Sequence, residues 1–168
     1  MIEPYYTDDY ATVYVGDCLD VLPQLGTFDV AFADPPYNFG FDYGDGFNDK
    51  RPDDEYASWC AEWFAMLRER TRLTFITPGH GNQRQWINRK PAGVAAWYKP
   101  GNPSGAGIFQ FCEWEPVYVW GKGRIGGSDV FKATLNPQFK GDVGHPCPKP
   151  ELLVRRIIAA SKATSILD

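Results

Sequence analysis

Residues Phe28-Asp29-Val30-Ala31-Phe32-Ala33-Asp34-Pro35-Pro36-Tyr37 contain the feature that decides the fold. The apolar run Phe28–Ala33 predicts a buried β-strand, so Asp34-Pro35-Pro36-Tyr37 falls at its carboxyl end. Open α/β sheets bind ligands at this edge. The prolines fix the backbone and remove two N–H donors, which leaves carbonyl acceptors between a carboxylate and an aromatic ring. This combination suits an exocyclic amino group of a planar base. An ordinary turn, which Asp and Pro also favour, is the alternative.

The composition predicts a single globular domain over residues 1–168, with enough length for a hydrophobic core. Hydrophobic residues make up 43% of the chain, and no apolar run is long enough to span a membrane. The first residues lack a basic stretch followed by an apolar core, so we expect no secretory signal and a cytoplasmic location. The four cysteines have no metal-ligand spacing, and we expect reduced thiols and no metal site.

The charge distribution is ambiguous. A net charge of −4 argues mildly against nucleic-acid binding, but it does not exclude a local basic patch. Residues 121–144 and 82–90 hold modest clusters of Lys and Arg. Solvated surface is the alternative interpretation of both clusters.

Strand and helix patterns alternate along the chain. This alternation predicts an α/β fold with a mostly parallel sheet and helices on both of its faces. Residues 38–49, rich in Gly, Asp and Phe, are typical of a loop. The expected helices are Leu19–Leu25, Asp53–Arg70 (capped by Asp53 or Asp54) and Glu151–Ser161, and the expected strands are Thr12–Val15, Phe28–Ala33, Leu73–Thr77, Val94–Tyr98, Pro116–Trp120 and Thr164–Asp168.

Five sequence blocks occur in an order that resembles a known family, the amino-group DNA methyltransferases that use S-adenosylmethionine, in their permuted arrangement. The resemblance covers nearly the whole chain and implies a Rossmann-like methyltransferase fold. The blocks are Gly16-Asp17-Cys18, Asp34-Pro35-Pro36-Tyr37-Asn38, Trp97-Tyr98-Lys99-Pro100, Trp114-Glu115-Pro116 and His145-Pro146-Cys147-Pro148-Lys149-Pro150.

The resemblance also implies roles for individual residues. Asp34 and the Pro35 carbonyl would accept hydrogen bonds from the target amino group, and Tyr37 would stack on the flipped base. The other residues implied at the catalytic and substrate sites are Pro36, Asn38, Phe39 and Lys99. The residues implied at the cofactor site are Asp17, Cys18, Asp34, His145, Lys149 and Asp168. From the residues themselves, Asp17 could instead be a helix cap, and His145 a surface loop residue.

Two departures from the family pattern stand out. A glycine-rich cofactor turn, a helix and another strand are expected after Thr164–Asp168, and they are absent from this sequence. The sheet would then have unpaired edges, which invite a complementing chain or a second copy. Omitted residues, a truncated gene and a split protein are three open explanations. In addition, residues 121–144, where such enzymes often read their target, form a short insert, which predicts a short or loosely read site.

The expected activity is methyl transfer to adenine N6 in DNA, since the tetrad begins with Asp. Cytosine-N4 transfer, an inactive DNA-binding or partner-binding remnant, and methylation of protein glutamine or RNA are the alternatives. A dinucleotide oxidoreductase is not expected, because no Gly-x-Gly-x-x-Gly follows the first strand. The expected host is a bacterium or its phage. The target sequence stays open, as do the oligomeric state and the presence of a restriction partner.

Overall fold

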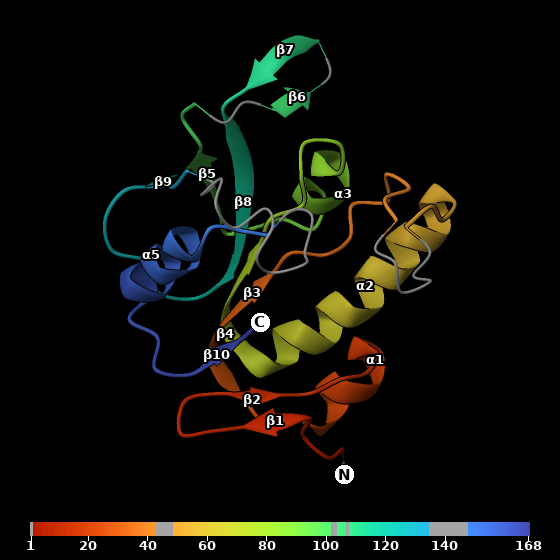
Figure 1. The fold of residues 1–168 in the computed structure, drawn as a ribbon, viewed down its shortest axis with the longest axis vertical. Coiled ribbons are helices and arrows are strands. Elements are labelled where there is room, and N and C mark those ends of the chain that lie inside the picture. Colours follow the sequence, from red (N-terminus) through yellow and green to blue (C-terminus); the bar gives the residue numbers. More distant parts are fainter. Residues whose placement is uncertain (1, 43–48, 102–103, 107, 135–147) are drawn as a thin grey trace.

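A mixed six-stranded sheet is the centre of the fold in the computed structural model, which describes residues 2–42, 49–101, 104–106, 108–134 and 148–168 (Figure 1). Its order is β10-β3-β4-β8-β5-β9. Strands β10, β3, β4, β5 and β9 run in one direction and β8 runs against them, so the expected mostly parallel sheet is confirmed. The bounds are β3 Phe28–Ala33, β4 Thr71–Ile76, β5 Gly93–Tyr98, β8 Trp114–Gly121, β9 Val130–Lys132 and β10 Ile166–Leu167.

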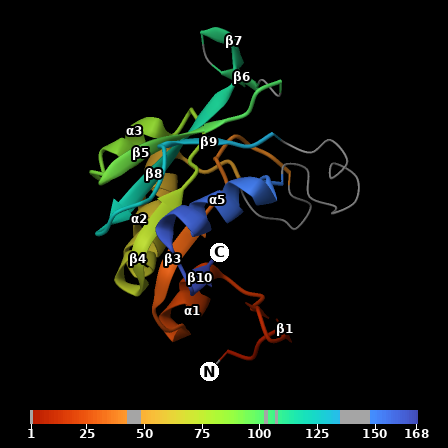
Figure 2. The same cartoon turned by 90° about the vertical axis from the view of Figure 1, so that its left-hand side faces the viewer.

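Helices cover both faces of the sheet, as the sequence predicts (Figure 2). Helix α5 (Glu151–Ser161) buries Leu153 and Ile157 against one face, together with Phe75 and Trp97. Helix α2 (Asp53–Arg70) packs its aromatic stripe against the other face. Trp63, Trp86 and Trp120 are part of this second core. The ring centres of Phe64 and Trp120 lie 4.9 Å apart.

Helix α2 has the predicted bounds, but its N-cap differs from the expected one. Its N-cap is Pro52, and neither Asp53 nor Asp54 caps it with a side chain. Both carboxylates lie inside the first turn, where they favour the positive end of the helix dipole. Arg68 and Arg70 occupy the last turn and complement the other end.

The first expected strand, Thr12–Val15, is not part of the central sheet. Strand β2 (Thr12–Val13) pairs antiparallel with β1 (Tyr6–Thr7) in a separate two-stranded sheet. A strand of a parallel sheet is buried on both faces, whereas Val13 and Val15 are largely exposed. The prediction that Thr12–Val15 is a strand of the central sheet was therefore wrong, because so short an apolar run does not show whether a strand is buried.

Several further elements were not predicted from the sequence. They are α3 (Gln83–Ile87), strand β9 and the antiparallel pair β6 (Ser104–Ala106) and β7 (Phe109–Cys112). The expected helical segment Leu19–Leu25 appears as α1 (Cys18–Val21) followed by a 3-10 turn at Leu22–Gln24. In the described part of the chain, no helix has the length and apolarity needed to cross a membrane.

Candidate functional site

The carboxyl ends of β3, β4 and β10 bring three polar residues to one edge of the sheet. Ala33 pairs with Ile76, so Asp34 and Thr77 follow side by side, and the Thr77 N–H donates to the Ala33 carbonyl at 3.1 Å. Leu167 pairs with Ala31, which puts Asp168 at the same edge. Burial and the nearby Asp34 charge raise the pKa of the Asp168 carboxyl.

The Asp34 carboxylate is held by three donors from different segments. Its Oδ1 accepts hydrogen bonds from the hydroxyls of Thr77, at 2.7 Å, and Tyr37, at 2.9 Å. Its Oδ2 pairs with Lys149 Nζ at 2.9 Å. A carboxylate offers about four lone-pair sites. Among the residues that the structure describes, one acceptor position on Oδ2 therefore has no partner, on a side chain that is 29% exposed.

Lys149 is the cation of this edge and comes from the segment directly before α5. Its ammonium also donates to the Tyr37 hydroxyl at 3.0 Å. It lies 5.1 Å from the centre of the Tyr37 ring and 5.7 Å from that of Trp97, within reach of cation–π attraction. The ammonium is therefore bound between one carboxylate and two aromatic rings.

The loop after β4 fixes the position of Tyr37. Gly79 has φ +67°, and a Cβ there would lie 2.8 Å from Tyr37 Cε2, so the ring packs directly on the glycine backbone. The Asn82 side-chain amide donates to the Tyr37 carbonyl at 2.9 Å. Burial, followed by the charges of Asp34 and Glu115, raises the pKa of Tyr37. The phenol stays protonated and donates to Asp34.

The two prolines differ in their contacts. The Pro36 carbonyl accepts a hydrogen bond from the Tyr56 hydroxyl at 2.6 Å, which ties the turn to α2. Among the described residues, the Pro35 carbonyl accepts none. Of the two prolines, Pro35 therefore has the carbonyl that is available to accept a hydrogen bond from a ligand.

A buried carboxylate organises the next residues, Asn38 to Phe41. Asp49, only 4% exposed, accepts hydrogen bonds from the backbone N–H groups of Asn38, Phe39 and Phe41 at 2.8, 3.2 and 2.9 Å. Asn38, at φ +62°, also exchanges two hydrogen bonds with the Arg51 backbone. No local pattern pointed to Asp49, because it lies 8 to 11 positions from the residues whose backbone N–H groups it binds.

Lys99 directly follows β5 and forms an ion pair with Glu115 of β8. Its side chain is 4% exposed, and its ammonium lies 5.3 Å from the centre of the Trp97 ring. Glu115 Oε1 takes part in the pair, whereas Oε2 is buried and has no hydrogen-bond partner in the described part of the chain. The sequence placed Lys99 at the substrate site, but its pairing with Glu115 was not foreseen.

Asp17 and Cys18 lie apart from this network. Asp17 Oδ1 accepts from the Leu19 N–H at 2.9 Å and caps α1, and no described contact joins it to Asp34. Burial and the neighbouring Asp17 charge raise the pKa of the Cys18 thiol to about 11. His145 and residues 135–144 of the proposed insert 121–144 lie outside the described residues.

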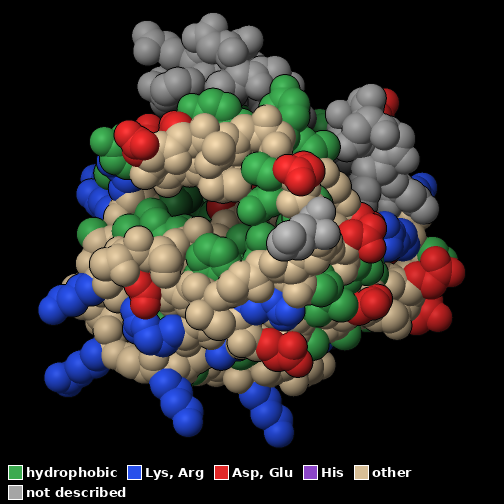
Figure 3. All heavy atoms as spheres, turned by 90° about the horizontal axis from the view of Figure 1, so that it is seen from below, with side chains coloured by type: hydrophobic (Ala, Val, Ile, Leu, Met, Phe, Trp, Pro, Cys, Tyr) green, Lys and Arg blue, Asp and Glu red, His purple; other side chains and the backbone are tan. Residues whose placement is uncertain are grey.

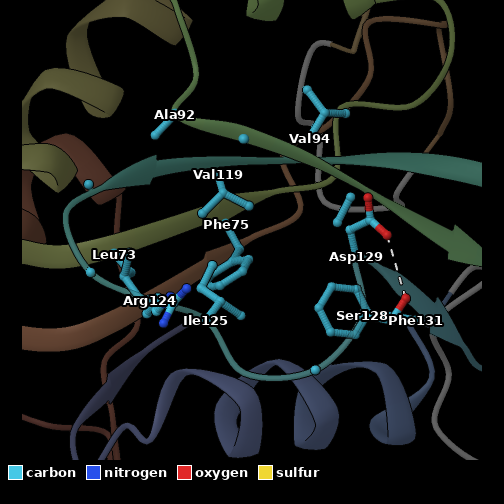
Figure 4. Close-up of a pocket in the computed structure, with 15 residues that line it drawn as sticks. Leu73, Phe75, Ala92, Val94, Val119, Arg124, Ile125, Ser128, Asp129 and Phe131 are labelled. Atoms are coloured by element: carbon cyan, nitrogen blue, oxygen red, sulfur yellow. Dashed lines mark hydrogen bonds between the residues drawn. The ribbon is translucent and has the colours of Figure 1, made fainter.

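A second hollow lies away from the Asp34 turn and is largely apolar. A cavity of about 270 Å³ lies between one face of the sheet and the segment after β8, lined by apolar residues such as Leu73, Phe75 and Phe131 (Figure 4). Seen from below, Lys and Arg side chains line one margin of the molecule (Figure 3).

In the ranges described, no cluster of three His, Cys, Asp or Glu residues suits a metal ion.

Comparison with known proteins finds partial sequence similarity to methyltransferases. No family model matches the chain. The Type II methyltransferase M.BamHI of Bacillus amyloliquefaciens is 38% identical over 64 residues, which are 37% of this chain and 15% of the relative. The Type II methyltransferase M.ScaI of Streptomyces caespitosus is 32% identical over 71 residues, 41% of this chain and 22% of the relative. Each match thus spans less than a quarter of the relative's length.

Structural comparison extends the similarity to most of the chain. The crystal structure of the M1.HpyAVI–SAM complex superposes with a TM-score of 0.53 and 18% identity, over 88% of this chain and 75% of that chain. The fold is Rossmann-like. At this identity the likeness establishes the fold and agrees with the fold class expected from the sequence.

Proposed function

We propose that this chain transfers a methyl group from S-adenosylmethionine to the exocyclic amino group of a flipped DNA base, with adenine N6 favoured. One observation carries the proposal. In the described part of the chain, Asp34 Oδ2 keeps an acceptor position without a partner, and the same turn holds the Tyr37 ring and the Pro35 carbonyl, which accepts no hydrogen bond there. Partial similarity to two Type II methyltransferases supports it.

The side chains at this edge fit a cationic methyl donor. Asp34 and Asp168 supply negative charge, and Tyr37 and Trp97 supply aromatic faces, both of which stabilise a cation. The ammonium of Lys149 already lies among these groups. When bound, S-adenosylmethionine would supply the electrophilic methyl group. The cofactor-site roles of Asp17, Cys18, His145, Lys149 and Asp168 are part of this proposal.

The residues of the turn would orient the amine. Asp34 accepts one amino hydrogen and the Pro35 carbonyl accepts the other, which favours a pyramidal nitrogen whose lone pair points at the methyl group. The positive charge that develops on nitrogen is stabilised by the Asp34 carboxylate, and alignment contributes the rest. Because the target atom is inaccessible in a duplex, the base must be extruded at a cost of a few kcal/mol. Stacking on Tyr37 offsets about 1–3 kcal/mol of it.

The edge of β10 gives the proposal a second part. In the described sheet β10 pairs with β3 alone, so its other side offers unpaired backbone groups. We propose that a strand from a complementing chain or a second copy pairs there, in a cytoplasmic protein of a bacterium or its phage. A rise of specific activity with protein concentration would support this association, and a constant value would oppose it.

The experiment that tests the function is transfer of a labelled methyl group from S-adenosylmethionine to unmethylated genomic DNA, followed by nucleoside analysis. The expected product is N6-methyladenine, lost in Asp34→Asn. Product on cytosine N4 would reassign the base, and label on RNA or protein would reassign the substrate. Absence of transfer, with DNA binding retained, would favour the inactive DNA-binding remnant.

A further inference from the structure

A buried carboxylate holds the loop that follows the Asp34 turn. The backbone N–H groups of Asn38–Phe41 all donate to Asp49: three reach its carboxylate, and that of Gly40 reaches its carbonyl at 2.7 Å. Asn38 and Gly40 have φ values of +62° and +76°. Successive N–H groups turned to one side in this way form a concavity that binds anions. Asp49, only 4% exposed, is the anion that fills it.

This loop is fixed without being part of the core. A buried carboxylate is costly unless hydrogen bonds compensate it, and here the loop backbone supplies them. The apolar side chains of the loop stay near the surface, since Phe39 is 67% and Phe41 is 41% exposed. Neither belongs to the two core clusters of the described residues. The buried charge therefore holds an exposed ring in place.

The loop after β4 supports the same ring from another side. The Tyr37 ring lies on Gly79, and the Phe39 ring lies on Gly81, where a new Cβ would be 2.7 Å from Phe39 Cζ. The two rings meet edge to face with their centres 6.0 Å apart. Phe39 is thus held by its own backbone, by a glycine and by Tyr37, although most of its surface is exposed.

A fixed and exposed ring beside Tyr37 suits DNA from which a base has been extruded. Extrusion takes the target base out of the stack, so the bases on either side lose a stacking partner. Apolar side chains such as phenylalanine insert at base steps in distorted DNA, and stacking of a base on an aromatic ring tolerates any sequence. Because the Phe39 ring is fixed before DNA binds, little conformational entropy is lost when it stacks.

We propose that Phe39 stacks on a DNA base next to the extruded one, and that Asp49 is its positioning residue. The proposal rests on the proposed function, which supplies the DNA and the extruded base. An amide is a poor substitute for the Asp49 carboxylate. Its Oδ1 accepts from Asn38, and its Oδ2 accepts from Phe39 and Phe41. Asp49→Asn would therefore turn an NH₂ donor toward at least one of these N–H groups.

The test measures binding to two duplexes of equal length by fluorescence anisotropy at one salt concentration. One duplex is fully paired, and the other has a single abasic nucleotide at its centre, where the neighbouring bases already lack a stacking partner. Wild-type protein is expected to prefer the abasic duplex. Phe39→Ala should reduce this ratio of dissociation constants about 5- to 150-fold, the loss of one stacking contact. Phe39→Trp keeps a ring and should retain the preference.

A double-mutant cycle separates positioning from a general effect on folding. Asp49→Asn should lower the abasic preference of the wild-type protein and have no effect on it in the Phe39→Ala background, because Asp49 acts through that ring. Equal reductions in both backgrounds would overturn the positioning role. Asp8→Asn is the matched control, since Asp8 also accepts two backbone N–H bonds, from Tyr10 and Ala11, but lies in the separate β1–β2 hairpin.

Gly81→Ala tests the second support without touching Asp49. The new Cβ would displace an exposed ring and no backbone, so this variant should lose the preference with little change in Tm. Gly26→Ala is its control, because no atom of the described residues lies within 4 Å of a Cβ there. An unchanged preference in both Phe39→Ala and Gly81→Ala would overturn the proposal.

Methyl transfer does not enter these binding measurements, so the two proposals fail separately. An abasic preference that depends on Phe39, without methyl transfer, would sink the proposed function alone. Methyl transfer without an abasic preference would sink the Phe39 proposal alone. Absence of binding to either duplex would also overturn the Phe39 proposal, while the transfer assay on genomic DNA would still decide the function.

Discussion

Asp34 and Asp17 each follow a strand-like apolar run, yet the structure gives them opposite surroundings. Asp34 lies at the end of a central strand and receives donors from Thr77, Tyr37 and Lys149. Asp17 follows a short strand outside the central sheet, and the described contacts of its carboxylate, with the Leu19 N–H and the Cys18 thiol, are local. The difference lies in the strands, because β3 is paired on both sides in the central sheet, and the ends of its neighbours β4 and β10 lie beside its carboxyl end.

The comparison predicts unequal costs of losing the two carboxylates. Asp34→Asn should lower methyl transfer about 10²- to 10³-fold, the usual effect of removing one preorganised electrostatic partner. Radiolabel transfer to genomic DNA measures the rate, and circular dichroism confirms the fold. Near-normal transfer by this variant would remove Asp34 from the centre of the site.

The support beneath Tyr37 can be tested at two glycines with the same backbone angle. Gly79→Ala should lose about 2 kcal/mol or more of stability, because it combines strain at φ +67° with a clash against the Tyr37 ring. Gly101, at φ +70°, has no atom of the described residues within 4 Å of a new Cβ. Gly101→Ala should therefore cost only the strain of about 1 kcal/mol. Equal losses in urea unfolding would mean that the ring contact adds nothing.

At Asp17, capping and ligand binding can be separated. Asp17→Ala should cost about 1 kcal/mol of stability through loss of the cap, and Asp17→Asn should keep it. If Asp17 also holds the cofactor, as proposed, Asp17→Asn raises KM for S-adenosylmethionine without lowering Tm. An unchanged KM would reduce Asp17 to a helix cap.

The smallest expected effect concerns pH. The raised pKa keeps Tyr37 protonated in the folded state above pH 10, where the unfolded chain releases its proton. Stability is therefore unaffected well below pH 10 and falls above it, by about 0.7 kcal/mol between pH 9.5 and 10.5. In Tyr37→Phe, the free energy of unfolding, measured by urea titration at each pH, should lack this additional fall with rising pH. The same pH dependence of stability in both proteins would place the Tyr37 hydroxyl in contact with water.

The sequence predicted the parts of the fold that depend on local pattern. Helices α2 and α5 have the expected bounds, and β3 ends where the apolar run meets Asp34. Partners supplied by distant segments were not predictable. Asp49 anchors a loop, Thr77 bonds to Asp34, and Glu115 pairs with Lys99, but none of these roles leaves a periodic signal. The Thr12–Val15 strand failed for the same reason, because its place depends on a neighbour and not on its own residues.

The ammonium of Lys149 means that the free protein carries its own competing ligand. A cation that seeks Asp34 and the two rings must exchange with Lys149, because the place is already taken. Its apparent dissociation constant is the intrinsic constant divided by the fraction of molecules whose lysine has moved away. Affinity at this edge is thus set as much by the lysine's occupancy as by the incoming ligand's own contacts.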